Sequence, residues 1–387
     1  MSTAEATEME PLTNQPESDP PAGGGVPVQQ IPAASSVPGA SAVTRASKPP
    51  LTSDAGTNGT IGKRDHFDSI DMLRGLAALA VCFYHVVTRF LSDGNPLRWV
   101  GSYGYLGVEC FFVISGFIIP YTLWRRDYGW SDAGRFMLAR VLRLHPAFLG
   151  SLLLVLLTLW LPTVMPPPWH LENAIDWGNV ALHLIYLPEW CGRPWLLGVY
   201  WSLAIEMQYY LLVALVYPWV SRGGNRAALA FAAVFAASAF LTPKASVGHH
   251  ACMFLPGMLM FWWKTGRIRG WQLGVCLAVM AVLLRCHDGG FRGVAAVGLA
   301  VWGIGWWRWR HPAGAWLGRI SYSFYLIHTI VAFAFLGWLT PLIGNEWGRT
   351  GLVLVAVALA LGAAALFYRW LEEPSHRWAR RCFRKRV

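Results

Sequence analysis

Long apolar runs separated by short polar connections dominate the sequence from about residue 66 onward. Many of them approach the roughly 20 residues with which a helix crosses a bilayer. This pattern predicts an all-α fold, a polytopic transmembrane helical bundle of about ten spans. The expected spans are 67–90, 105–123, 146–161, 197–218, 227–243, 248–263, 270–286, 292–307, 319–338 and 350–369. A further apolar stretch, 178–187, is too short to span and is interpreted as an excursion at the interface.

The first span carries polar residues that a simple membrane anchor does not need. Arg74 and His85 are eleven positions apart, close to three helical turns, so both side chains lie on one face. Asp71 precedes Arg74 by three positions and shares that face. Ionisable groups inside the hydrocarbon layer usually point into a bundle or a wet cavity. The pattern therefore fits either a buried ion pair with one core histidine or a functional site.

The basic residues indicate how the chain is oriented. The net charge is +11, but most basic residues occupy short connections between apolar runs, which is typical of membrane topology and not of nucleic-acid binding. With the N-terminus inside, twenty Lys and Arg fall on the inner side and seven on the outer side. The positive-inside rule then predicts an even number of spans and two cytoplasmic termini.

The composition of the two ends of the chain predicts the domain boundaries. Residues 1–65 are rich in Pro, Ala, Ser and Gly without apolar periodicity, which predicts a disordered cytoplasmic tail. Residues 66–376 form the expected transmembrane domain, and 377–387 a basic cytoplasmic tail. The seven cysteines are odd in number and include no C-x-x-C, which argues against a disulfide framework or a metal site.

Two other spans contain polar seams. Ser202, Glu206 and Tyr210 follow an i, i+4, i+8 pattern, and Ser321, Tyr325 and His328 follow i, i+4, i+7, so each set shares one helix face. Each seam, taken alone, is typical of hydrogen bonds that hold helices together.

The second span and the basic segment after it add further candidates. Glu109 is another intramembrane charge, and Ser115-Gly116 forms a small patch where another backbone can approach. Arg140 and Arg143 lie in the richest basic loop, 124–145, where arginine either enforces orientation or clamps an anionic phosphate group.

Five motifs occur in one order along the chain. They are Arg74-x10-His85, GVECFFVISGF at 107–117, RVLRLHP at 140–146, WSLAIEMQYY at 201–210 and SYSFYLIH at 321–328. Together they resemble the membrane-bound acyltransferase-3 family, the O-acyltransferases that modify surface polysaccharides and related glycans. The resemblance covers about 66–376, and the Leu371-Glu372-Glu373-Pro374 ending is also similar.

The resemblance implies roles for the matching residues. His85 would be the catalytic histidine and Arg74 its partner, with Glu206 lining the central site. Arg140 and Arg143 would bind the acyl-CoA donor. The supporting candidates are Asp71, Glu109, Ser115, Trp201, Ser202, Tyr210, Tyr325 and His328. His145 stands where the family more often has tyrosine, so the local donor contacts are not carried over.

The implied function is transfer of an acetyl or other short acyl group from cytoplasmic acyl-CoA to a hydroxyl of a surface glycan or exopolysaccharide. The expected partners are acyl-CoA, a glycan or lipid-linked sugar acceptor and the lipid bilayer of the bacterial inner membrane. No bound cofactor, metal or nucleic acid is expected. The alternatives are a transporter or flippase for a glycan or lipid-linked precursor, which would also use polar residues at mid-membrane depth, and acylation of a small molecule.

Overall fold

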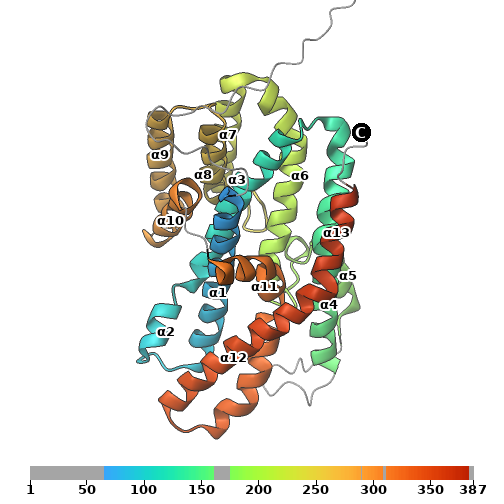
Figure 1. The fold of residues 1–387 in the computed structure, drawn as a ribbon, viewed down its shortest axis with the longest axis vertical. Coiled ribbons are helices and arrows are strands. Elements are labelled where there is room, and N and C mark those ends of the chain that lie inside the picture. Colours follow the sequence, from blue (N-terminus) through green and yellow to red (C-terminus); the bar gives the residue numbers. More distant parts are fainter. Residues whose placement is uncertain (1–64, 161–174, 289, 308–310, 383–387) are drawn as a thin grey trace, which may run out of the picture. The chain divides into compact units, whose positions relative to one another are not determined.

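The computed structural model describes residues 65–160, 175–288, 290–307 and 311–382, and the regular secondary structure of these segments is entirely helical (Figure 1). The expected disordered tail therefore lies outside the described residues, except for Asp65. The same holds for the end of the basic C-terminal tail and for residues 161–174, the first part of the connection before the fourth long span.

The α-helices of the described chain are α1 (Asp65–Phe90), α2 (Pro96–Gly101), α3 (Gly107–Arg125), α4 (Ala133–Trp160), α5 (Trp177–Leu184), α6 (Tyr200–Arg222), α7 (Gly224–Leu241), α8 (Ala251–Lys264), α9 (Gly270–Asp288), α10 (Arg292–Trp306), α11 (Pro312–Leu339), α12 (Glu346–Phe367) and α13 (Glu373–Cys382). The longer helices follow the predicted apolar runs in order, and α2, α5 and α13 are short additional helices. A π-helical turn, Tyr368–Glu372, joins α12 to α13. The all-α helical bundle is thus confirmed.

Eight helical segments of the described chain are long and apolar enough to cross a membrane. The other two expected spans correspond to α8 and α10, which have 14 and 15 residues. At about 1.5 Å per residue, each is shorter than the roughly 30 Å hydrocarbon core. Most of α8 is buried, so its apolar sequence reflects a position inside the bundle.

The basic segment after α3 differs from the expectation. Instead of a loop over 124–145, the chain forms helix from Ala133 onward, so Arg140 and Arg143 stand on α4. The arginines are interleaved with apolar residues at helical spacing, and this places them on the cavity side of a helix. The excursion expected at 178–187 contains α5, a helix of only 8 residues.

Close backbone contacts bring α1 against α11 at the centre of the bundle. A Cβ on Gly75 of α1 would lie 2.8 Å from the Gly318 amide nitrogen, and one on Gly318 would lie 2.1 Å from the Asp71 carbonyl oxygen. The same holds where α3 crosses α8, since a Cβ on Gly116 would lie 2.1 Å from the Phe254 carbonyl oxygen. Such crossings require small residues, and the predicted small-residue patch on α3 is confirmed.

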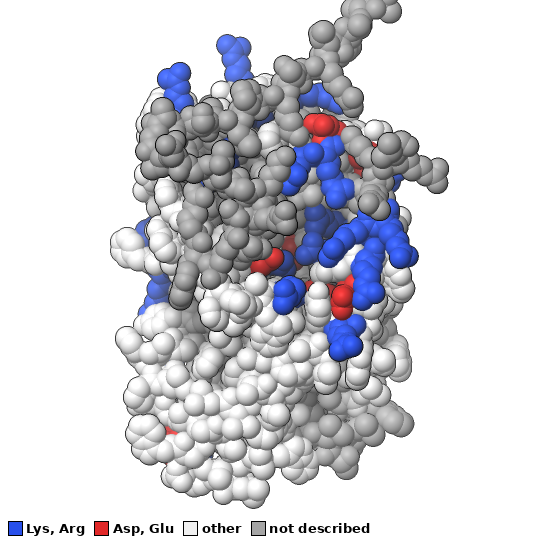
Figure 2. All heavy atoms as spheres, in the orientation of Figure 1, with Lys and Arg blue, Asp and Glu red and all other residues white. Residues whose placement is uncertain are grey.

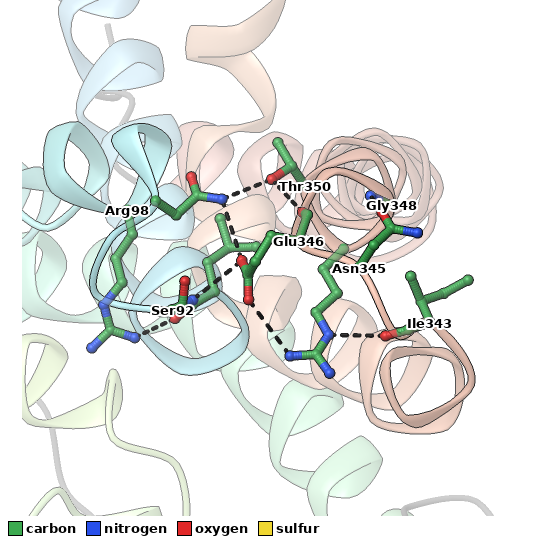
Figure 3. A network of polar contacts seen from close by, with 10 residues as sticks. Ser92, Arg98, Ile343, Asn345, Glu346, Gly348 and Thr350 are labelled. Carbon is green, nitrogen blue, oxygen red and sulfur yellow. Dashed lines mark hydrogen bonds and ion pairs between the residues drawn. The ribbon is translucent and has the colours of Figure 1, made fainter.

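A polar network ties the connection between α1 and α2 to the start of α12 (Figure 3). Asn95 Nδ2 donates to Thr350 Oγ1 at 2.9 Å and to Glu346 Oε2 at 3.4 Å, and the Ser92 amide donates to the same carboxylate oxygen at 3.4 Å. Arg98 donates to the carbonyls of Thr88 and Leu91 near the end of α1. These contacts fix the end of α1 nearest to His85.

The charged side chains in view are concentrated at one end of the molecule. Figure 2 shows Lys and Arg gathered in the upper half, where α13 lies, while the lower half is almost free of charge. This arrangement agrees with the unequal distribution of basic residues expected from the sequence. The orientation of the protein in the membrane can be tested directly by labelling cysteines at positions 191 and 226.

We expect Cys191, which is exposed and free, to react from the outside with a membrane-impermeant maleimide. The positive-inside rule places it there. In a Cys191→Ser, Cys286→Ser background, Arg226→Cys should react only after the cell is permeabilised. Labelling of position 226 in intact cells would invert the proposed topology.

Candidate active site

The central feature of the structure is a cavity of about 560 Å³, bounded by α1, α3, α4, α6, α11, the π-helical turn and α13. Six arginines line it, Arg74, Arg126, Arg140, Arg143, Arg319 and Arg380, against three carboxylates, Asp71, Glu206 and Glu372. The wall also includes apolar side chains of α3. The cavity therefore combines strong positive charge with an apolar interior, which suits an anionic ligand with a hydrophobic portion.

Arg140 is held deep in this wall by aromatic rings. Its side chain is only 9% exposed, and the guanidinium carbon lies 5.0 Å from the ring centre of Phe136 and 5.1 Å from that of Tyr210. A planar guanidinium is well suited to this stacking. Arg143 follows about one turn later on α4. Both arginines of the predicted pair therefore line the same cavity.

Glu206 is the hub of a hydrogen-bond network within the wall. Its Oε1 accepts from the Tyr210 hydroxyl and from Ser115 Oγ, the latter at 3.3 Å. Since Tyr210 also covers Arg140, the network joins α3, α4 and α6. The polar seam predicted on α6 is therefore a helix-joining network that also faces the cavity.

A second polar pair links the cavity to the histidines. Ser202 Oγ and the Tyr325 hydroxyl are 2.7 Å apart, and both residues line the cavity. The Tyr325 ring packs 6.1 Å from the His328 ring, which in turn lies 5.4 Å from the His85 ring, measured between centres. A continuous set of side chains therefore leads from the cavity to His85.

The structure does not place every predicted residue in the cavity wall. Asp71, Arg74, Arg140, Arg143, Ser115, Ser202, Glu206, Tyr210 and Tyr325 line it. His85 and His328 lie beyond Tyr325 and are absent from the lining. Glu109 is buried on α3, and Trp201 packs its ring on Phe112 and His250 instead.

Sequence reasoning missed the contribution of the C-terminal segment. Glu372, His376 and Arg380 also line the cavity. Glu372 is 2% exposed, and it accepts hydrogen bonds from the amide of Ser323 at 3.0 Å and from its hydroxyl at 2.5 Å. His376 Nε2 lies 3.3 Å from the same carboxylate. The available signal is the Leu371-Glu372-Glu373-Pro374 ending, whose resemblance to the family implies no role by itself.

We expect Glu372→Ala to lower the thermal midpoint of the purified protein in detergent. The substitution removes the carboxylate acceptor of the buried Ser323 hydroxyl, a loss of about 1–3 kcal/mol. Glu373→Ala is the matched control, because Glu373 makes only a partly exposed pair with Arg377, worth about 0–1 kcal/mol. Equal midpoints for the two variants would contradict the structural role of Glu372.

Comparison with known proteins finds one matching family and several curated relatives. A family model described as an acyltransferase domain matches residues 67–369. The O-acetyltransferase OatA of Staphylococcus aureus (strain NCTC 8325 / PS 47) is 32% identical over 163 residues, covering 39% of this chain and 24% of the relative. A putative O-acetyltransferase of Staphylococcus aureus (strain COL) is 29% identical over 163 residues, covering 40% and 25%.

The matched region thus spans about a quarter of the length of these curated relatives. No solved structure matches the chain. The family match, in contrast, includes all of α2 to α12, most of α1, and the residues that build the cavity, except Glu372, His376, Ala379 and Arg380 at its C-terminal rim. On this evidence, the chain belongs to the membrane-bound acyltransferase-3 family.

Proposed function

We propose that this protein is an integral-membrane O-acyltransferase that moves an acetyl or other short acyl group from cytoplasmic acyl-CoA to a hydroxyl of a surface glycan or exopolysaccharide. The observation that carries the proposal is the arginine-lined cavity whose wall leads through Tyr325 to His328 and His85. The family membership and the O-acetyltransferase names of two relatives support it.

The donor fits the cavity by its chemistry. Coenzyme A carries phosphates at one end and a thioester at the end of a slender arm. Arg140 and Arg143 would bind the phosphate groups, because arginine offers a planar fork of donors to such oxygens. The arm would run along the apolar side chains of α3 toward Phe111 and Tyr325, whose rings pack 5.7 Å apart.

His85 would carry the proton transfer. A neutral imidazole takes the proton of the acceptor hydroxyl as that oxygen attacks the thioester carbonyl, and the resulting imidazolium returns it to the departing thiolate of coenzyme A. A covalent acyl-histidine step is the other chemical route open to the same residue. Arg74, on the same helix face, would stabilise the developing oxyanion or orient the donor.

The remaining parts of the proposal follow from this chemistry. Residues 66–376 would form the catalytic domain, 1–65 and 377–387 the cytoplasmic tails, and the bacterial inner membrane the location. The acceptor would be a glycan or a lipid-linked sugar. Acetyl-CoA acts as a substrate in this mechanism, so no resident cofactor is needed.

Mass spectrometry of surface glycans tests the function directly. Cells that carry the wild-type chain should show acetyl-mass substituents that are lost in cells without it. Unchanged decoration together with lost glycan export would instead indicate a transporter. Acetylation of a small molecule with unchanged glycans would refute the glycan acceptor.

A further inference from the structure

His328 presents one nitrogen that the bundle does not use. The ring is fully buried on α11, at 0% exposure. Its Nδ1 lies 2.8 Å from the carbonyl oxygen of Tyr325 and 3.1 Å from that of Phe324. Since carbonyl oxygens only accept, Nδ1 carries the hydrogen, and in the neutral ring Nε2 then bears a lone pair.

This Nε2 is buried and has no hydrogen-bond partner among the described residues. Buried polar atoms nearly always have a partner, and an orphan in a native structure calls for an explanation. The Nδ1 bond does not supply one. It runs to carbonyls three and four positions earlier on the same helix, so it ties no two helices together.

The aromatic neighbours of the ring include one candidate donor. The rings packed on His328 are those of Phe324, Tyr325 and His85. Phe324 has no donor, and the Tyr325 hydroxyl is paired with Ser202. His85 is the remaining ring, on α1, and an imidazole N–H is a good donor to an imidazole lone pair.

The separation of the two rings suits such a bond. Two imidazoles joined by an N–H···N bond of about 2.9 Å have ring centres roughly 5 Å apart. The observed separation is 5.4 Å, with the ring planes inclined at 39°. A small rotation of the partly exposed His85 side chain therefore brings its N–H to His328 Nε2.

We propose that His328 is a positioning residue for His85: its buried Nε2 accepts a hydrogen bond from one ring nitrogen of His85 and so fixes the tautomer that leaves the other nitrogen free as the base. This inference rests on the proposed acyl transfer. His328 keeps its own proton on Nδ1 throughout. His85 gains the acceptor's proton on its free nitrogen and passes it to the thiolate, so the pair ends each cycle unchanged.

Two substitutions separate positioning from packing. His328→Asn keeps a δ-position donor for the Tyr325 carbonyl but has no ε acceptor, whereas His328→Gln places an amide oxygen near the ε position. Both replace the ring by a primary amide, and the thermal stability of each variant reports the packing that is lost. If His328 positions His85, the glutamine variant should retain more activity than the asparagine variant.

The assay uses inside-out membrane vesicles of the producing strain, which carry the native acceptor, with isotope-labelled acetyl-CoA as the probe. Label incorporated into vesicle glycan is measured against acetyl-CoA concentration. We expect His328→Asn to lower the saturating rate roughly tenfold, the effect of one hydrogen bond on a rate constant. The half-saturating acetyl-CoA concentration should stay unchanged, and His328→Gln should recover part of the rate.

The outcomes distinguish a failure of the proposed acyl transfer from a failure of the positioning role of His328. Wild-type vesicles without label would refute the proposed function and this assignment with it. Label incorporation by wild type and by His328→Asn at equal rates would refute the positioning role alone. So would an equal loss in both variants accompanied by an equal loss of thermal stability.

A second measurement needs no change at position 328. In protein labelled with nitrogen-15 at histidine, the His328 Nε2 resonance should move toward that of a free imine nitrogen in His85→Ala. A resonance indifferent to His85→Ala would overturn the proposal.

Discussion

Replacing His85 by alanine is expected to reduce acetyl incorporation by about 10²- to 10⁴-fold, the usual contribution of a general acid–base group. The ring lies at the end of the route from the cavity through Tyr325 and His328. It is partly exposed, so its removal leaves a small gap and not a large core cavity. The vesicle assay with labelled acetyl-CoA measures the rate.

Thr88→Ala is the matched control for this variant. Thr88 stands less than one turn beyond His85 on α1, and its hydroxyl donates to the Tyr84 carbonyl at 2.5 Å. Its loss should leave the rate within about twofold, because a partly buried hydroxyl bonded to its own helix contributes little. A well-folded His85→Ala protein with substantial turnover would remove His85 from the chemistry.

Replacing Arg140 by lysine is expected to raise the half-saturating concentration of acetyl-CoA by roughly tenfold, with a smaller effect on the saturating rate. Lysine keeps the charge but loses both the donor fork and the stacking on Phe136 and Tyr210. The variant thus weakens donor binding in the ground state without touching the proton transfer at His85.

Arg135→Lys on the same helix is the control, because Arg135 is exposed and outside the cavity lining. It makes the same chemical change at the same membrane boundary. If Arg140→Lys leaves the donor dependence unaltered while the protein inserts in the opposite orientation, Arg140 serves topology and not the donor.

The helices were predictable because each apolar run carries its own length signal. The start of α4 at Ala133 was not predictable. A run of arginines between apolar segments is typical of a polar loop, although here Arg140 and Arg143 belong to a helix and line a charged cavity. Hydropathy also overstated the length of α8, whose apolar side chains are buried against other helices. A one-dimensional pattern records burial without saying whether lipid or protein provides it.

In the candidate site, too, contacts within one helix could be predicted and contacts between helices could not. Spacing alone placed Glu206 and Tyr210 on one face, and they are hydrogen-bonded in the structure. The bond from Ser115 to Glu206 and the packing of His328 on His85 depend on helix crossings instead. Local periodicity does not specify which helices cross, so these contacts needed the three-dimensional arrangement.

The pairing of α1 with α11 has a consequence for biosynthesis. The ribosome delivers α1 to the membrane long before α11 exists, because the close approach of Gly75 on α1 to Gly318 on α11 joins residues 243 positions apart (318 minus 75). Until then, the ionisable side chains of α1 lack the helix that covers them, which is unfavourable in lipid. Nascent chains that end before Pro312 should therefore be retained by the insertion machinery or degraded, instead of accumulating as partial bundles.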